Sequence, residues 1–256
     1  AETDGGVFVI NSAGGNDTIT GGAGADTINS DGGADVIVTG NGNNVVSAGD
    51  GDDTITLGTG ADSINAGNDN DSIVGGGNIN ASDTINGGAG SDELTFTDNG
   101  TATTDLDNVT NVETIELLSG VGNNFAYTIT DSSAFDGDAT GVTIDADALD
   151  ATEALNFSAT NLTRAITILS GAGNDTIVDG TGNDSIVTNA GADSVTLSGN
   201  GNNVVSTGDG NDTIAAGTGN DSIDAGANDD LVKFLSANFD ADDTVAGGAG
   251  ADTIQV

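Results

Sequence analysis

The chain contains no cysteine, proline, methionine, tryptophan or histidine, and only 3% of its residues are aromatic. Without cysteine there are no disulfides and no thiolate metal sites, and without histidine the common zinc sites and catalytic triads are excluded. No apolar run is long enough for a membrane helix, and no basic, apolar signal-peptide start is present. We therefore expect no direct membrane insertion.

Positive charge is almost missing as well. The chain has one Lys and one Arg but 41 Asp and Glu residues in total, which gives a formal net charge of −39. Nucleic acid and anionic membrane surfaces are excluded as partners, since both attract the opposite charge. A net charge of this size destabilises a compact fold by self-repulsion unless something neutralises it. Few aromatics together with abundant Gly and Asp favour disorder. A folded chain of this composition needs a further organising feature.

A nine-residue repeat supplies that feature. Residues 21–29, GGAGADTIN, place glycines at positions one, two and four, Asp26 at position six, and a short strand after it. From Ser12 to Val74 the sixth position recurs every nine residues, as Asp17, Asp26, Asp35, Asn44, Asp53, Asp62 and Asp71. The eighth position is aliphatic each time, as Ile19, Ile28, Ile37, Val46, Ile55, Ile64 and Ile73. A strict repeat of this length predicts a solenoid with the aliphatic column as its core.

The repeat divides the chain into three predicted segments. Residues 1–95 form a first array with a lead-in strand, residues 96–164 a β-rich spacer, and residues 165–256 a second array. The second array copies the first, since Asn203 corresponds to Asn44 at an offset of 159 residues (203 − 44). The chain therefore reads as a tandem duplication within a longer protein. The spacer either continues the solenoid, which we favour, or makes a separate small sandwich, and residues 147–155 favour a short helix.

The repeats GGAGADTIN (21–29), GGAGSDELT (87–95) and GGAGADTIQ (247–255) resemble the repeat-in-toxin (RTX) nonapeptide, a calcium-binding β-helix repeat. The resemblance implies an all-β fold: two parallel β-roll arrays in which two nonapeptides make one coil. Successive repeats then face opposite edges, and Ca²⁺ ions lie in the turns between stacked coils.

The resemblance also implies which residues bind calcium. Carboxylate ligands would come from the sixth position: Asp17, Asp26, Asp35, Asp53, Asp62, Asp71, Asp83, Asp92, Asp175, Asp184, Asp193, Asp212, Asp221, Asp230, Asp243 and Asp252. Turn backbone would come from Gly21, Gly24, Gly49, Gly51, Gly58, Gly60, Gly171, Gly173, Gly180, Gly182, Gly208, Gly210, Gly217 and Gly219. Asn44 and Asn203 either weaken or empty their sites, or serve the turn alone.

The chemistry of the chain points the same way as the resemblance. Ca²⁺ takes oxygen ligands from carboxylates and carbonyls and needs neither His nor Cys. Carboxylates stacked about 4.8 Å apart repel one another, and a divalent ion between them turns repulsion into cross-linking. We expect several Ca²⁺ ions and folding coupled to their binding. The alternatives are that the Asp residues are simple turn formers, or that the acidity is a halophile's solvated surface.

Three functions are compatible with such a segment. It is expected to be a structural, self-assembling part of a secreted bacterial surface protein of the surface-layer (S-layer) type. Residues 111–117 also resemble the Thr- and Leu-rich strands between RTX blocks in such proteins. Alternatives are an extension module of a large RTX adhesin, or the secretion and folding domain of an RTX toxin or hydrolase whose catalytic part is absent. No enzymatic activity is expected here, since the carboxylates lack a pocket-forming aromatic set and a third catalytic partner. The resemblance implies type I secretion and an extracellular or cell-surface location.

Overall fold

A computed structural model describes residues 5–97, 106, 108–120, 126–130 (backbone only), 141–160, 162–234, 239 and 241–256. Within these residues the chain is all-β, with strands and turns and no helix, as the sequence predicts. It divides into two compact units, the first ending at Glu116 and the second beginning at Leu117. No helix in the described part is long and apolar enough to cross a membrane.

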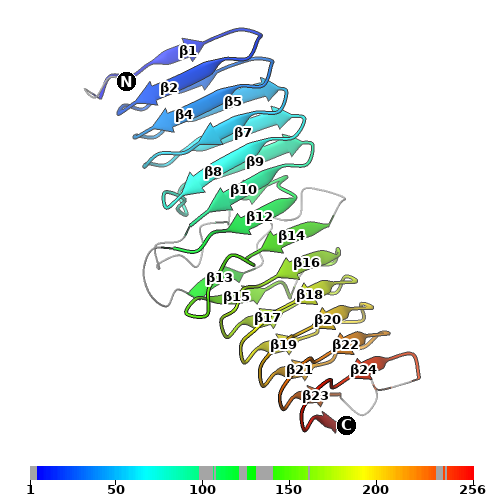
Figure 1. The fold of residues 1–256 in the computed structure, drawn as a ribbon. Helices are drawn as coiled ribbons and strands as arrows, with labels where there is room; N and C mark the ends of the chain where they lie inside the picture. The colour runs from blue at the N-terminus through cyan, green and yellow to red at the C-terminus, as the bar shows by residue number, and fades with distance from the viewer. Residues whose placement is uncertain are drawn as a thin grey trace. The chain divides into compact units, whose positions relative to one another are not determined.

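The first unit is a parallel solenoid in which successive strands belong alternately to one sheet and to the other (Figure 1). One sheet has the order β1 (Val9–Asn11), β3 (Thr27–Asn29), β5 (Val45–Asp50), β7 (Ser63–Asn68), β9 (Thr84–Ala89) and β11 (Val109–Thr110). The other has the order β2 (Thr18–Gly22), β4 (Val36–Gly40), β6 (Thr54–Thr56), β8 (Ser72–Gly76), β10 (Glu93–Phe96) and β12 (Thr114–Leu117). Two nonapeptides therefore complete one coil.

The second unit repeats this arrangement with its own strands. One row of strands runs β13 (Ala126–Thr130), β15 (Ala154–Ser158), β17 (Thr176–Val178), β19 (Ser194–Thr196), β21 (Thr213–Ala215), β23 (Leu231–Lys233) and β25 (Thr253–Gln255). The other runs β14 (Val142–Asp145), β16 (Ile166–Leu169), β18 (Ser185–Val187), β20 (Val204–Ser206), β22 (Ser222–Asp224) and β24 (Thr244–Ala246).

The core is the aliphatic column that the sequence predicts. In-register parallel pairing stacks Ile37 on Ile19 and Ile55 on Ile37. All seven eighth-position residues between Ile19 and Ile73 are buried, and Ile37, Ile55 and Ile73 are fully so. A side chain that points inward from a strand stacks on its counterparts in the coils above and below. Each coil therefore buries little apolar surface on its own, and its stability depends on its neighbours.

The described parts of the predicted spacer form coils of the same kind. Strand β11 pairs with β9, β14 with β16, and β15 with β17. The division between the two units falls within the predicted spacer, at Glu116. Residues 98–105, 107, 121–125, 131–140 and 161 of this segment lie outside the described residues. The predicted three-segment boundaries remain predictions.

The prediction of a short helix at residues 147–155 is wrong. These residues form turns followed by the start of strand β15. Leu149 and Leu155 are buried, and the Leu149 N–H donates to the Ala146 carbonyl in a turn. Pairing of β15 with β13 and β17 overrides the helix propensity of the Ala- and Leu-rich segment.

Candidate metal centres

Each sixth-position residue directly precedes a strand, so the solenoid gathers these residues into columns. In the first unit one column holds Asp17, Asp35, Asp53, Asp71 and Asp92, and the other holds Asp26, Asn44, Asp62 and Asp83. In the second unit the columns hold Asp175, Asp193, Asp212, Asp230 and Asp252, and Asp184, Asn203, Asp221 and Asp243. The two-edge arrangement of the sixth-position residues is thus present in both units.

These carboxylates are buried, which ordinary turn-forming aspartates on a solvated surface are not. Relative exposure is 3% or less at the sixth-position Asp residues from Asp26 to Asp230. Only Asp17, Asp243 and Asp252, in the outermost repeats, are more exposed. A column of buried carboxylates is unfavourable unless its charges are compensated.

One oxygen of each carboxylate binds the neighbouring coil. The backbone N–H of Asp17 donates to Asp35 Oδ1 (2.7 Å), that of Asp35 to Asp53 Oδ1 (2.7 Å), and that of Asp53 to Asp71 Oδ1 (2.8 Å). The same ladder runs through the second unit, where the Asp193 N–H donates to Asp212 Oδ1 (2.8 Å). The sixth position therefore joins successive coils directly.

The second carboxylate oxygen, Oδ2, does not link the coils in this way at many of these residues. In the described chain the Oδ2 atoms of Asp35, Asp53, Asp71, Asp212 and Asp230 are buried and accept no hydrogen bond. The pKa of Asp53 is raised to about 6 and that of Asp71 to about 7, mainly by burial and also by the charges of neighbouring carboxylates. Rows of buried, unpartnered carboxylate oxygens fit a bound cation, because they leave acceptors with nothing to accept.

Two asparagines indicate where a cation would sit. The Asn44 amide nitrogen donates to the carbonyls of Gly42 (2.9 Å) and Gly40 (3.3 Å) and to Asp62 Oδ1 (3.0 Å). Its NH₂ group occupies a point at which carboxylate and carbonyl oxygens converge, and it stands in for a cation there. Asn44 therefore satisfies its turn without an ion, and the structure favours the interpretation of Asn44 as serving the turn.

Asn80 plays the same part in the lengthened eighth repeat, and the sequence analysis did not identify it. Its amide nitrogen lies 2.8 Å from the Gly60 carbonyl, 3.0 Å from Asp83 Oδ2 and 3.3 Å from the Asn78 carbonyl. The inserted residues place the neutral Asn80 amide beside Asp83 Oδ2, whereas the Oδ2 atoms of Asp35, Asp53 and Asp71 have no donor in the described chain. In the sequence only the three-residue insertion marked this repeat as unusual, and it did not indicate which residue would make these contacts.

The turn glycines let neighbouring backbones approach closely. A Cβ atom added to any of the fourteen predicted turn glycines would lie 1.5–3.0 Å from a carbonyl oxygen of an adjacent coil. At Gly60 the contact would be 2.1 Å from the Gly42 oxygen, and φ is +144°, a region that other residues rarely adopt. The glycines therefore permit the coil stacking that places one carboxylate over the next. Whether their carbonyls bind calcium stays a prediction.

A second ladder, missed by the sequence analysis, runs along the fifth position. Asn16 Oδ1 accepts from the Ala34 N–H (3.1 Å), Asn43 Oδ1 from the Ala61 N–H (2.9 Å), and Asp52 Oδ1 from the Asn70 N–H (3.0 Å). A fifth-position side chain accepts from an N–H group of the following coil, whereas a sixth-position side chain accepts from an N–H group of the preceding coil. The recurring Asn-Asp pairs of the sequence were the signal.

Glu113 and Glu153 are further residues of this kind that the sequence analysis did not assign. Glu113 Oε2 accepts from the Asp92 N–H at 2.6 Å, which continues the sixth-position column beyond the last nonapeptide. Glu153 is buried and accepts from the N–H groups of Gly120 (2.9 Å) and Asp150 (3.0 Å). Both stand two residues before a buried aliphatic residue, Ile115 and Leu155, as the sixth-position Asp residues do.

Side chains alone do not form a metal site. Among the described residues no group of three or more His, Cys, Asp or Glu side chains is placed to hold an ion. An ion held here would take oxygens other than these side chains as well, and calcium binds backbone carbonyl and water oxygens readily. The donor set fits a hard divalent cation and does not fit zinc or other metals that prefer nitrogen or sulfur.

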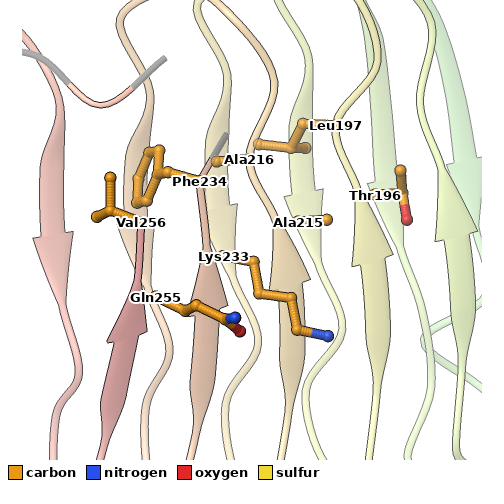
Figure 2. A pocket seen from close by; sticks show the side chains of 8 residues that line it. All are labelled: Thr196, Leu197, Ala215, Ala216, Lys233, Phe234, Gln255 and Val256. Atoms are coloured by element: carbon orange, nitrogen blue, oxygen red, sulfur yellow. The ribbon is translucent and has the colours of Figure 1, made fainter. Parts of the chain in front are cut away.

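An apolar pocket of about 430 Å³ lies near the C-terminal strands of the second unit. Figure 2 shows its lining, which includes Leu197, Ala216, Phe234 and Val256, with Lys233 as its one charged side chain. It contains none of the sixth-position carboxylates. The carboxylate columns, and not this pocket, are the candidate functional sites.

Fold and site together define a class: parallel β-rolls that carry columns of buried carboxylates in the turns between coils. A family model for the RTX calcium-binding nonapeptide repeat (4 copies) matches residues 11–46, 47–81, 78–95, 169–199, 197–232 and 239–255. These segments cover more than half of the chain, and the chain belongs to this family of calcium-binding repeats. No curated protein and no solved structure matches it.

Proposed function

We propose that the chain is a structural segment of a secreted bacterial surface protein, of the S-layer type, that folds on Ca²⁺ and self-associates into a lattice or fibre. The observation that carries the calcium-dependent part is the row of buried, unpartnered Oδ2 atoms, at Asp35, Asp53 and Asp71 in one unit and Asp212 and Asp230 in the other. When bound, calcium supplies the positive charge between these coils.

A structural role is favoured over a catalytic one by the way in which the carboxylates are used. Each sixth-position Asp between Asp35 and Asp71 in that column binds the adjacent coil through Oδ1. Such a residue is fixed in the stacking of the solenoid and is poorly placed to move protons for a substrate. The second array repeats, within its own unit, the parallel stacking of coils seen in the first.

Extracellular folding follows from the calcium requirement. Type I secretion passes an unfolded chain through a calcium-poor cytosol and releases it into calcium outside the cell. A chain without cysteine needs no oxidative folding, and one without proline has no slow prolyl isomerisation to delay folding. Both features suit folding after export.

The outermost strands are the candidate contacts for self-association. In the described structure β1 and β25 each have a single neighbour in their sheets, and Val9 and Ile254 on them are half-exposed or more. An open strand edge accepts another strand. A further coil of the same polypeptide and a second copy both fit such an edge, and the experiment below distinguishes them.

Electron microscopy of the purified full-length protein, with and without Ca²⁺, tests this proposal. Ordered sheets or fibres that form in calcium and disperse in EDTA support the S-layer reading. Monomers in which the arrays form one continuous stalk support the alternative of an RTX adhesin module. A soluble monomer with hydrolase or toxin activity elsewhere in the full-length chain would select the secretion and folding domain instead.

A further inference from the structure

Asp179 is a buried carboxylate that the repeat pattern does not explain. It directly follows strand β17, at the first position of the repeat 179–187, and its exposure is 0%. The strand register places Ala159 and Leu197, both buried, at the corresponding positions of the adjacent coils. In the first unit the corresponding residue is Gly21, at an offset of 158 residues (179 − 21). An ionisable group thus stands where its neighbours are apolar and its counterpart has no side chain.

In several repeats the first position lies against the sixth-position carboxylate of the same repeat. The Ser170 hydroxyl donates to Asp175 Oδ2. A Cβ atom at Gly21 would lie 2.8 Å from Asp26 Oδ2, and one at Gly87 would lie 2.7 Å from Asp92 Oδ2. In the repeat 179–187 the sixth-position residue is Asp184, and the Asp179 carboxyl lies near enough to it for the charge of Asp184 to raise the pKa of Asp179.

The groups that donate to these two carboxylates are backbone N–H groups and the Ser198 side chain. Asp179 Oδ1 accepts from the Ser198 N–H and Asp184 Oδ1 from the Ile166 N–H (2.9 Å). Both Oδ2 atoms are buried and form no hydrogen bond of normal geometry, although the Gly180 amide lies near enough to Asp184 to lower its pKa. The pKa of Asp179 is raised to about 8, mainly by burial, and the charges of Asp184 and Asp221 contribute to this rise.

We infer that Asp179 and Asp184 together bind one divalent cation, so that this turn is a two-carboxylate site beyond the single carboxylate that the nonapeptide pattern provides. The inference rests on the calcium-dependent folding proposed above. The cation is Ca²⁺ or a similar hard ion, because only oxygen ligands face it.

Asn203 fits this assignment. It takes the sixth position in the coil after Asp184, and its Oδ1 accepts from the Asp184 N–H at 2.9 Å. Its buried Nδ2 forms no hydrogen bond of normal geometry, although the Asn203 side chain lies near enough to Asp221 to lower the pKa of that carboxyl. With a neutral residue at 203, the charges of Asp179 and Asp184 equal that of a single divalent ion. An aspartate there would add a third carboxylate to the same turn.

A crystal structure of the full chain grown with Ca²⁺, with anomalous data collected at long wavelength, tests the site directly. We expect a peak bound by both carboxylates, with Ca–O distances of about 2.3–2.6 Å. In Asp179→Asn that peak should weaken or vanish while the peaks at other turns remain. Asp224→Asn, which removes the same charge from an exposed position of strand β22, should leave every peak unchanged.

Hydrogen exchange gives the matching solution measurement. The free Ca²⁺ concentration at which residues 176–206 become half-protected should rise about tenfold in Asp179→Asn, since ligand charge sets calcium affinity over several decades. Protection of the first unit should keep its calcium midpoint. Peaks at other turns with none between Asp179 and Asp184, or an unchanged or tighter midpoint in Asp179→Asn, overturn this inference and leave the calcium-folding proposal standing. An absence of calcium peaks throughout the map overturns both.

Discussion

Asp35 and Asp53 occupy the same place in adjacent coils, and the backbone N–H of Asp35 donates to Asp53 Oδ1 over 2.7 Å. The second oxygen of Asp53 is buried and accepts no hydrogen bond. One carboxylate thus performs two separable tasks: Oδ1 links two coils, and Oδ2 is left for a cation. Substitutions that remove the tasks one at a time distinguish their contributions.

Asp53→Asn keeps an acceptor for the Asp35 N–H and removes the charge. We expect more Ca²⁺ to be needed for folding, with little loss of stability in saturating calcium. Asp53→Ala also leaves the Asp35 N–H buried and unpaired, which costs about 1–3 kcal/mol more. Urea unfolding in excess Ca²⁺ measures the difference, and Asp224→Asn is the exposed control. Equal stabilities for the Asn and Ala variants would show that the ladder bond contributes nothing.

Asn44→Asp replaces an amide that stands in for a cation with a carboxylate. The variant should bind one more Ca²⁺ per chain and should be less structured in chelator, because the amide donors to Gly40 and Gly42 are lost. Asn43→Asp adds the same charge one residue earlier and keeps the oxygen that accepts from Ala61. Metal analysis after dialysis counts the ions. An unchanged count in Asn44→Asp, equal to that of Asn43→Asp, contradicts the interpretation of Asn44.

Stability without calcium should depend on pH in the direction opposite to that of most acidic proteins. The folded-state pKa values of Asp53 (about 6), Asp71 and Asp193 (about 7) are raised from 3.8, mainly by burial. A raised pKa contributes stability that is present below pH 3.8 and is lost as pH rises through 6–7. In EDTA, circular dichroism should therefore show more β-structure near pH 4–5 than at pH 8. A pH-independent signal would contradict the buried, uncompensated carboxylates.

The inward column can be tested at two neighbouring residues of strand β4. Ile37 is fully buried, whereas Val36 is 44% exposed on the outer face. In saturating Ca²⁺, Ile37→Ala should lower the free energy of unfolding by about 2–5 kcal/mol. Val36→Ala should change it by less than about 0.5 kcal/mol. Similar effects of the two substitutions would mean that the strand does not pack as described.

The nine-residue phase predicted a solenoid with an aliphatic core, and the RTX resemblance implied that two repeats make one coil and that successive repeats face opposite edges. Asp26 and Asp35 accordingly precede strands of opposite sheets, β3 and β4. With 18 residues per coil, the parallel register of β2 with β4 and of β3 with β5 pairs residues 18 apart.

What the sequence did not reveal depends on contacts between coils. The roles of Asn16 and Asn43 arise from an N–H group 18 residues away in the chain, and that of Asn80 from the Gly60 carbonyl in the coil before it. Asp179 looks like an ordinary acidic residue until its burial is known. The helix expected at 147–155 failed because local propensity says nothing of the strands on either side.

The most direct measurement of the central claim is far-ultraviolet circular dichroism, with small-angle X-ray scattering, at neutral pH before and after exhaustive chelation. With Ca²⁺ the chain should be compact and rich in β-structure. In EDTA it should lose that signal and expand, and added Ca²⁺ should restore both. A chain that stays compact and equally rich in β-structure after all calcium has been removed would contradict the account.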